Sequence, residues 1–104
     1  MNYQEKYLAI ARDIVLEHVD NERYAVFLFG SRAAGTHARS ADLDIGIEGD
    51  TPLPPKIIAA INEKLEQSLV PYHIDIVDFY GADDRFKKIA KERIITWNQP
   101  ANLH

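Results

Sequence analysis

The sequence predicts a single α+β domain in which helices pack against a mixed β-sheet. Two observations favour this class: helical and strand-like patterns of apolar residues alternate along the chain, and 104 residues provide room for one core only. A hydrophobic content of 46% with a charged content of 27% is typical of globular proteins. We therefore expect one domain over residues 1–104.

The N-terminal part predicts a helix, a strand and one helical turn. Apolar residues recur at three-to-four spacing over residues 3–19, which predicts an amphipathic helix. Residues 24–29 (YAVFLF) are a nearly continuous apolar run, which indicates a central buried strand. Residues 31–34 can form one helical turn closed at Gly35, and a polar loop over residues 36–41 follows.

Two further strands are predicted, and each carries acidic residues between apolar ones. Residues 42–47 (DLDIGI) alternate with a period of two, so one face of this strand is apolar and the other bears Asp42 and Asp44. Residues 73–79 (HIDIVDF) predict a third strand, in which Asp75 lies between two isoleucines. Both strands therefore present carboxylates.

Helices are expected between and after these two strands. Apolar spacing predicts a second amphipathic helix that begins near Pro55 and ends at about Ser68. Asp83 is a candidate N-cap for a basic last helix. Residues 94–97 either end that helix or form a short edge strand, and the polar tail over residues 98–104 is expected to be loose.

Composition excludes several classes of protein. The chain has no cysteine, which rules out disulfides, thiolate catalysis and cysteine-based zinc sites and fits a reducing compartment. Charged residues interrupt the N-terminal helix, so it resembles neither a signal peptide nor a membrane span. A net charge of −4 argues against general binding to nucleic acid. We expect a cytoplasmic protein without membrane contact.

The candidate chemistry begins with the paired aspartates. Asp42 and Asp44 project from the same face of a strand, and two like charges at ~4 Å repel by about 4 kcal/mol at an effective dielectric near 20. A third carboxylate at Asp75 would add to this repulsion. A divalent cation removes the conflict, and oxygen ligands suit Mg²⁺ or Mn²⁺. The alternative is that both aspartates lie on an ordinary solvated face.

A glycine-serine pair strengthens the catalytic interpretation. Gly30 and Ser31 follow the buried strand and open a helical turn, where backbone N–H groups and the serine hydroxyl can point at a phosphate. Glycine has no Cβ, so the backbone can approach a ligand closely. A phosphate cradle beside a metal site would bind a nucleotide.

This combination resembles a known signature. Gly30-Ser31, ten residues, and then Asp42-x-Asp44, with Asp75 as a third acid, resembles the nucleotidyltransferase fold shared with the DNA polymerase β superfamily. In length and sequence the chain resembles the prokaryotic minimal nucleotidyltransferases, the MNT proteins. These are often encoded beside a HEPN-domain protein, as the antitoxin of a toxin–antitoxin pair. The resemblance covers nearly the whole chain.

The resemblance implies a role for each of these residues. Gly30 and Ser31 would hold the triphosphate of ATP, Asp42 and Asp44 would bind a pair of Mg²⁺ (or Mn²⁺) ions, and Asp75 would complete one metal site and help to deprotonate the acceptor. The implied activity is transfer of AMP from ATP to a hydroxyl group, with pyrophosphate leaving. The implied acceptor is a tyrosine of a cognate HEPN toxin, which the modification would silence, and a hetero-oligomer is expected.

Two positions depart from the family pattern. Ala34 stands where relatives often have a basic residue, and Ala41 where they often have serine. Neither change touches an expected metal ligand, so we favour an active protein adenylyltransferase over a degenerate copy. Two alternatives stay open: an inactive antitoxin that neutralises the HEPN partner by binding, and a transferase that acts on a small hydroxylated molecule.

Other charged residues are weaker candidates for the functional site. Arg32 is a candidate phosphate ligand, and the alternative is a surface arginine that caps the short turn. Arg39 in the loop is similar. Asp78 competes with Asp75 as the third acid but lies on the opposite face of its strand, so Asp75 is preferred.

Three remaining patterns favour structural roles. Residues 30–35 have P-loop glycine spacing, but Thr36 and His37 stand where lysine and serine or threonine are required. The histidines show no ligand spacing and are expected at the surface or at helix ends; they are His18, His37, His73 and His104. A basic cluster on the last helix fits a solvated face better than an acidic partner; it comprises Arg85, Lys87, Lys88, Lys91 and Arg93.

Overall fold

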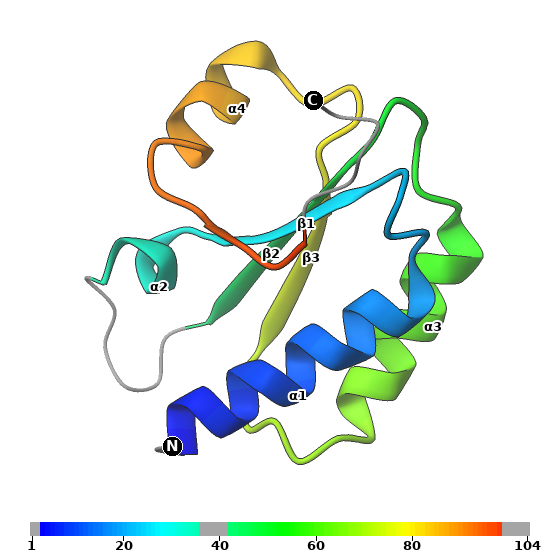
Figure 1. Cartoon of the computed structure of the whole chain (residues 1–104), viewed down its shortest axis with the longest axis vertical. Coiled ribbons are helices and arrows are strands. Elements are labelled where there is room, and N and C mark those ends of the chain that lie inside the picture. The colour runs from blue at the N-terminus through cyan, green and yellow to red at the C-terminus, as the bar shows by residue number, and fades with distance from the viewer. Residues whose placement is uncertain (1–2, 36–41, 99–104) are drawn as a thin grey trace.

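The structure is a computed structural model that describes residues 3–35 and 42–98 (Figure 1). Helices and strands alternate along most of the chain. In order, the elements are α1 (Tyr3–His18), β1 (Ala25–Phe29), α2 (Ser31–Ala34), β2 (Leu43–Glu48), α3 (Pro55–Glu66), β3 (Ile74–Asp78), α4 (Asp84–Ala90) and β4 (Ile95–Thr96).

The strands form one mixed sheet in the order β3-β2-β1-β4. β1 is antiparallel to both β2 and β4, whereas β2 and β3 are parallel. Parallel neighbours cannot be joined by a tight turn, and α3 makes the crossover between them. The predicted mixed sheet and the central position of β1 are confirmed.

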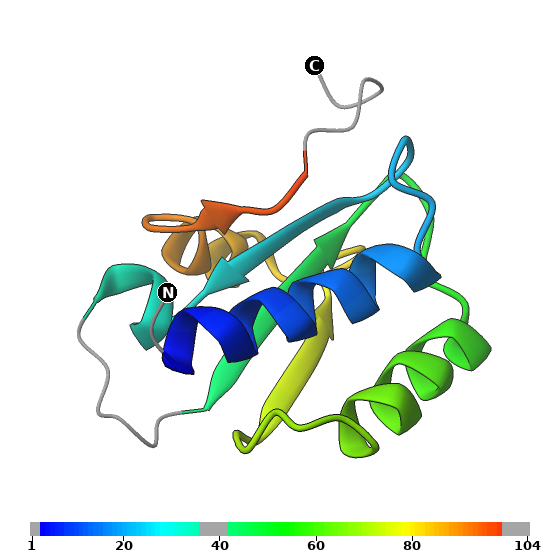
Figure 2. The same ribbon diagram turned by 60° about the horizontal axis from the view of Figure 1, so that its bottom comes forward.

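The two long helices cover one face of the sheet. Side chains from α1 and α3 pack with alternate residues of β1 and β2 in the main core, which includes Val15, Val26, Ile45 and Ile61, all fully buried. Figure 2 shows α1 and α3 together on this side of the strands, with α4 beyond the sheet. The period of two in β2 therefore places Leu43 and the two isoleucines in this core and turns Asp44 and Glu48 to the opposite face.

The opposite face carries a smaller aromatic cluster beneath α4. Phe27, Phe29 and Phe79 are buried together, and Phe86 of α4 meets Phe79 with ring centroids 5.4 Å apart. Gly46 lies under these rings and has no room for a side chain, since a Cβ at this position would lie 2.4 Å from the Phe27 ring. The aromatic rings thus occupy the space that a side chain at Gly46 would need.

Two lysines of the last helix are tied to the sheet. Glu48 at the end of β2 pairs with Lys91 and lies 3.5 Å from the Lys87 ammonium nitrogen. Lys91 is exposed, as the expected solvated basic face requires, and Lys87 is partly exposed; both also pair with a carboxylate of the same chain. These ion pairs help to fix α4 over the aromatic cluster.

Most local expectations are confirmed. The Asp83 side chain caps α4 by accepting from the backbone N–H groups of Arg85 and Phe86, and residues 94–97 contain the edge strand rather than the end of a helix. Asn98 was expected in a loose tail, and this is wrong. Its Oδ1 accepts from the Val26 N–H at 2.7 Å and its Nδ2 donates to the Tyr24 carbonyl at 3.0 Å.

The remaining expectations lie partly beyond the described residues. The polar loop 36–41, with Thr36, His37, Arg39 and Ala41, and the tail 99–104 fall outside them. Within the described ranges, none of the helices combines the length and the apolar character that a bilayer crossing requires.

Candidate active site

The predicted phosphate cradle is a tight turn between β1 and α2. Gly30 has φ 75° and ψ −157°, a conformation essentially restricted to glycine, and Gly35 closes the turn with φ 76° and ψ 13°. The Ala34 N–H donates to the Gly30 carbonyl at 3.1 Å, which forms the single helical turn expected from the sequence. Ser31 is partly exposed at its start, where a ligand can reach it.

The cradle lies directly against the second aspartate. Phe29 pairs with Asp44 across β1 and β2, so the next residue, Gly30, passes over the Asp44 side chain. A Cβ on Gly30 would lie 2.4 Å from Asp44 Oδ2, a distance that real Cβ atoms essentially never show. Gly30 is therefore required for its backbone conformation and for the close approach of this carboxylate.

Strand register brings the third acid to the same place. β2 and β3 are parallel with Asp44 opposite Asp75, and both side chains lie on the face away from the main core. Asp42 and His73 each immediately precede the paired residues Leu43 and Ile74. The two strands therefore present two rows of polar side chains, Asp42 and Asp44 on one strand and His73 and Asp75 on the other.

Three of these four side chains converge on one point. The candidate ligand atoms of Asp42, His73 and Asp75 all lie within 4.8 Å of one another, and all three residues are exposed. His73 Nε2 lies 3.1 Å from Asp75 Oδ1. The Asp44 carboxylate is directed toward Gly30, so it lies between this cluster and the cradle.

The site is electrostatically unfavourable without a cation. Partial burial raises the pKa of Asp44 above its ordinary value, the negative charges of Asp75 and Asp42 raise it further, and nearby His73 opposes the shift. The carboxylate oxygens of Asp42 and Asp75 are donors that suit Mg²⁺ or Mn²⁺. The residues present therefore fit the divalent metal that the sequence predicted.

His73 is a site residue that sequence reasoning missed. It was expected to be a surface histidine, and it is exposed, but it lies beside Asp75 and Asp42. Spacing held a signal: His73 and Asp75 are two apart on a strand and so share a face. His18 meets the expectation of a helix-end residue, because its Nδ1 lies 2.7 Å from the Ile14 carbonyl.

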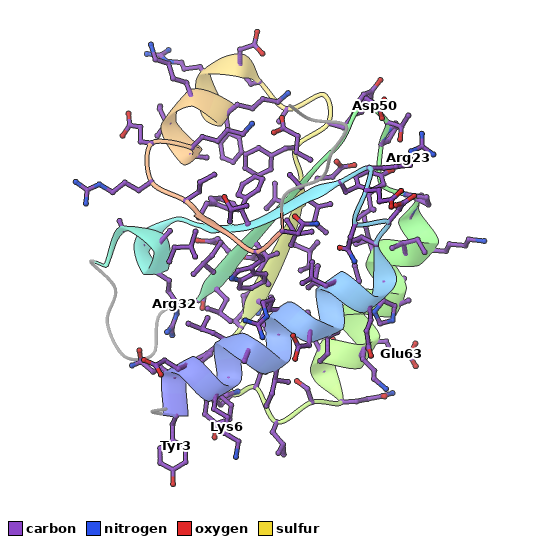
Figure 3. The ribbon with its side chains drawn as sticks, in the orientation of Figure 1. Tyr3, Lys6, Arg23, Arg32, Asp50 and Glu63 are labelled. Atoms are coloured by element: carbon purple, nitrogen blue, oxygen red, sulfur yellow. The ribbon has the colours of Figure 1, made fainter. Side chains whose placement is uncertain are left out.

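Arg32 is not the surface arginine considered in the sequence. It is buried at 5% exposure, and its guanidinium carbon lies 4.1 Å from the centroid of the Tyr72 ring, in cation–π contact. Figure 3 shows the side chain extending from α2 toward the N-terminal part of α1. A phosphate contact from Arg32 stays a prediction.

The Asp78 carboxylate accepts hydrogen bonds from the backbone, and this structural role supports the preference for Asp75 as the third acid. Its Oδ2 accepts from the Leu53 N–H at 2.9 Å and its Oδ1 accepts from the Tyr80 N–H at 3.0 Å. These bonds hold the segment before α3 against the end of β3. Asp75 points to the opposite face, as the alternation predicted.

An open groove adjoins the cradle on the aromatic side. It has a volume of about 550 Å³ and lies between the turn at Gly30, Ser31 and Ala34 and the α4 residues Phe86 and Ile89. Phe86 and Ile89 remain exposed by 42% and 61%. The site thus has acidic side chains on one side of the cradle and an apolar groove on the other.

Comparison with known proteins agrees with this geometry. The family described as nucleotidyltransferase domain matches residues 8–96. A Haemophilus influenzae protein named "Probable protein adenylyltransferase MntA" is 27% identical over 92 residues, which cover 88% of this chain and 79% of the relative.

Solved structures share the fold. A chain of a toxin–antitoxin complex with AMP-PNP has a TM-score of 0.70 at 19% identity, covering 94% of this chain and 75% of that chain. A chain from a complex of a tri-AMPylated Shewanella oneidensis HEPN toxin with an MNT antitoxin has a TM-score of 0.60 at 17% identity, with 91% and 74% covered. The expected fold is confirmed.

Proposed function

The chain belongs to the nucleotidyltransferase domain family, and we propose that it transfers AMP from ATP to a hydroxyl group of a HEPN-domain partner protein, acting as its antitoxin. One observation carries the chemistry: Gly30 lies against the Asp44 carboxylate, and Asp44 lies opposite Asp75. A triphosphate on Gly30 and Ser31 would therefore lie next to the metal-binding acids. Nucleotidyl transfer needs this juxtaposition of phosphate and cation.

The chain's own residues have separate tasks in this proposal. Gly30 and Ser31 orient the triphosphate through backbone N–H groups and a hydroxyl. Asp42, Asp44 and Asp75 hold the divalent ions, Mg²⁺ or Mn²⁺. Bound metal supplies charge neutralisation at the attacking and leaving oxygens of an in-line displacement.

The transfer step releases one proton, which comes from the acceptor hydroxyl group. The acceptor hydroxyl oxygen forms a bond to the α-phosphorus of ATP, the bond from that phosphorus to the α–β bridging oxygen breaks, and pyrophosphate leaves. Asp75, with about half of its side chain exposed, accepts the hydroxyl proton. The product is an AMP phosphodiester on the acceptor.

A protein acceptor is supported by two findings. The Haemophilus influenzae relative is named as a protein adenylyltransferase, and one structural neighbour is a complex that contains an AMP-modified HEPN toxin. The groove beside the cradle is open and has exposed apolar side chains at Phe86 and Ile89, which a partner protein could cover. We infer that the acceptor is a tyrosine of that partner.

The test combines the purified chain, ATP and Mg²⁺ with the product of the neighbouring open reading frame, once that frame is shown to encode a HEPN-domain protein. We expect intact-mass spectra of the partner to gain one or more AMP increments, located on tyrosine by peptide mapping. The matched control is Asp42→Asn/Asp44→Asn, which keeps side-chain size and removes both charges. A partner that binds the chain tightly and gains no mass would contradict enzymatic action and identify an antitoxin that acts by binding alone. AMP transfer to a small hydroxylated compound by the isolated chain would contradict the protein acceptor.

A further inference from the structure

The metal site contains a side chain that all-oxygen nucleotidyl-transfer chemistry does not require. His73 stands beside Asp42 and Asp75 at the start of β3, and its ring nitrogen faces the Asp75 carboxylate at 3.1 Å. This placement results from two features of the fold. His73 and Asp75 share a strand face, and the parallel register sets them beside Asp42 and Asp44.

We propose that His73 is a nitrogen ligand of the metal site and that it makes the site select a transition-metal ion such as Mn²⁺ over Mg²⁺. Its candidate ligand atom and those of Asp42 and Asp75 all lie within 4.8 Å of one another, so one ion can contact all three. His73 Nε2 and Asp75 Oδ1 already converge at 3.1 Å, and a cation that both atoms bind would lie between them.

The chemical consequence follows from the donor set. Mg²⁺ binds oxygen ligands almost exclusively in proteins, whereas imidazole suits transition metals. Replacing one oxygen donor by a nitrogen therefore lowers the advantage of Mg²⁺ and raises that of Mn²⁺. This inference rests on the proposed metal-dependent AMP transfer, which gives the bound metal its role. The placement of His73 beside Asp42 and Asp75 does not depend on which acceptor is used.

A role limited to the hydrogen bond with Asp75 makes a different prediction. In that role His73 would orient the Asp75 carboxylate and would stay outside the coordination sphere of the metal. Its removal would then weaken Mn²⁺ and Mg²⁺ binding alike, since both ions share the carboxylate. Direct coordination instead predicts a selective loss of Mn²⁺ affinity and a nitrogen signal from the protein at the bound ion.

The test uses the full chain labelled uniformly with ¹⁵N, with Mn²⁺ alone and with Mn²⁺ plus AMP-PNP. Pulsed electron paramagnetic resonance should show ¹⁵N modulation from the protein, which is distinct from the ¹⁴N of the nucleotide. Calorimetric titration should show that His73→Asn loses about tenfold in Mn²⁺ affinity, with Mg²⁺ affinity changed by less than about threefold. His18→Asn serves as the control, because His18 contacts the Ile14 carbonyl in α1 rather than the acidic cluster.

The outcomes separate this inference from the proposed function. Absence of ¹⁵N modulation in both wild-type samples, or equal losses of Mn²⁺ and Mg²⁺ affinity in His73→Asn, would overturn nitrogen ligation even if AMP transfer is observed. Nitrogen modulation that disappears in His73→Asn supports it even if the HEPN partner is never modified. His73 is exposed, so the substitution should leave folding intact, and circular dichroism checks this.

Discussion

Gly30 connects the predicted phosphate cradle to the acids of the proposed metal site, and Gly30→Ala tests that connection. The new Cβ would lie 2.4 Å from Asp44 Oδ2, whereas ordinary contact begins at 3.4 Å, so the two atoms must separate by about 1 Å. A misplacement of this size in a catalytic site costs about a hundredfold in rate. The backbone of Gly30 (φ 75°, ψ −157°) adds about 1–3 kcal/mol of strain for alanine.

Gly35 provides a matched control five residues away. Its φ of 76° is nearly the same, but a Cβ at Gly35 would meet nothing within 4 Å. Gly35→Ala should therefore cost about 1–2 kcal/mol of stability through left-handed backbone strain alone. Because both alanines strain the backbone and only one contacts Asp44, the difference in function between the variants reports mainly the contact with Asp44, together with the somewhat larger strain at Gly30.

The assays measure stability, metal binding and turnover separately. Urea denaturation gives the free energy of unfolding, titration gives Mn²⁺ affinity, and AMP transfer to the partner gives the rate. We expect Gly30→Ala to lose about a hundredfold in turnover and to bind Mn²⁺ more weakly, and Gly35→Ala to stay within about threefold of wild type in both. Equal functional losses in the two variants would refute the argument that Gly30 serves the Asp44 carboxylate.

Two further predictions concern stability without metal. The raised pKa of Asp44 means that the folded protein holds this proton to higher pH than the unfolded chain, so its contribution to stability falls as the pH rises from 3.8 through the folded pKa. Asp44→Asn should therefore be more stable than wild type at pH 7 in EDTA, with no such gain well below pH 3.8. Urea denaturation at both pH values measures this, and a variant that is no more stable at pH 7 would contradict it. Gly46→Ala should lose about 1–3 kcal/mol by overpacking, because its Cβ would lie 2.4 Å from the Phe27 ring and 2.8 Å from the Phe79 ring. The fluorescence of the single tryptophan reports its urea midpoint, and an unchanged midpoint would mean that the rings can move aside.

Local sequence patterns predicted the helices and strands. Which residues of separate strands lie side by side depends on strand pairing, and the local patterns did not predict it. The period of two placed Asp42 on the polar face of its strand, but only the parallel register with β3 shows that His73 stands beside it. The contact of Arg32 with Tyr72 joins residues forty positions apart, and Asn98 bonds to β1 across most of the chain. The periodicity of neighbouring residues does not predict such contacts, because they depend on how separate helices and strands pack.

On the face of β2 opposite the main core, the acidic side chain of Asp44 is explained by a role in function rather than by a role in folding. Three positions of β2 lie on this face. Aromatic rings fill the space that a side chain at Gly46 would need, two lysines pair with Glu48, and the third position is Asp44. Asp44 is different, because partial burial and the negative charges of Asp75 and Asp42 raise its pKa. A bound cation would stabilise the ionised form of this carboxylate. The same strand thus uses one position to hold α4, one to pack aromatic rings and one to place a carboxylate in the proposed metal site.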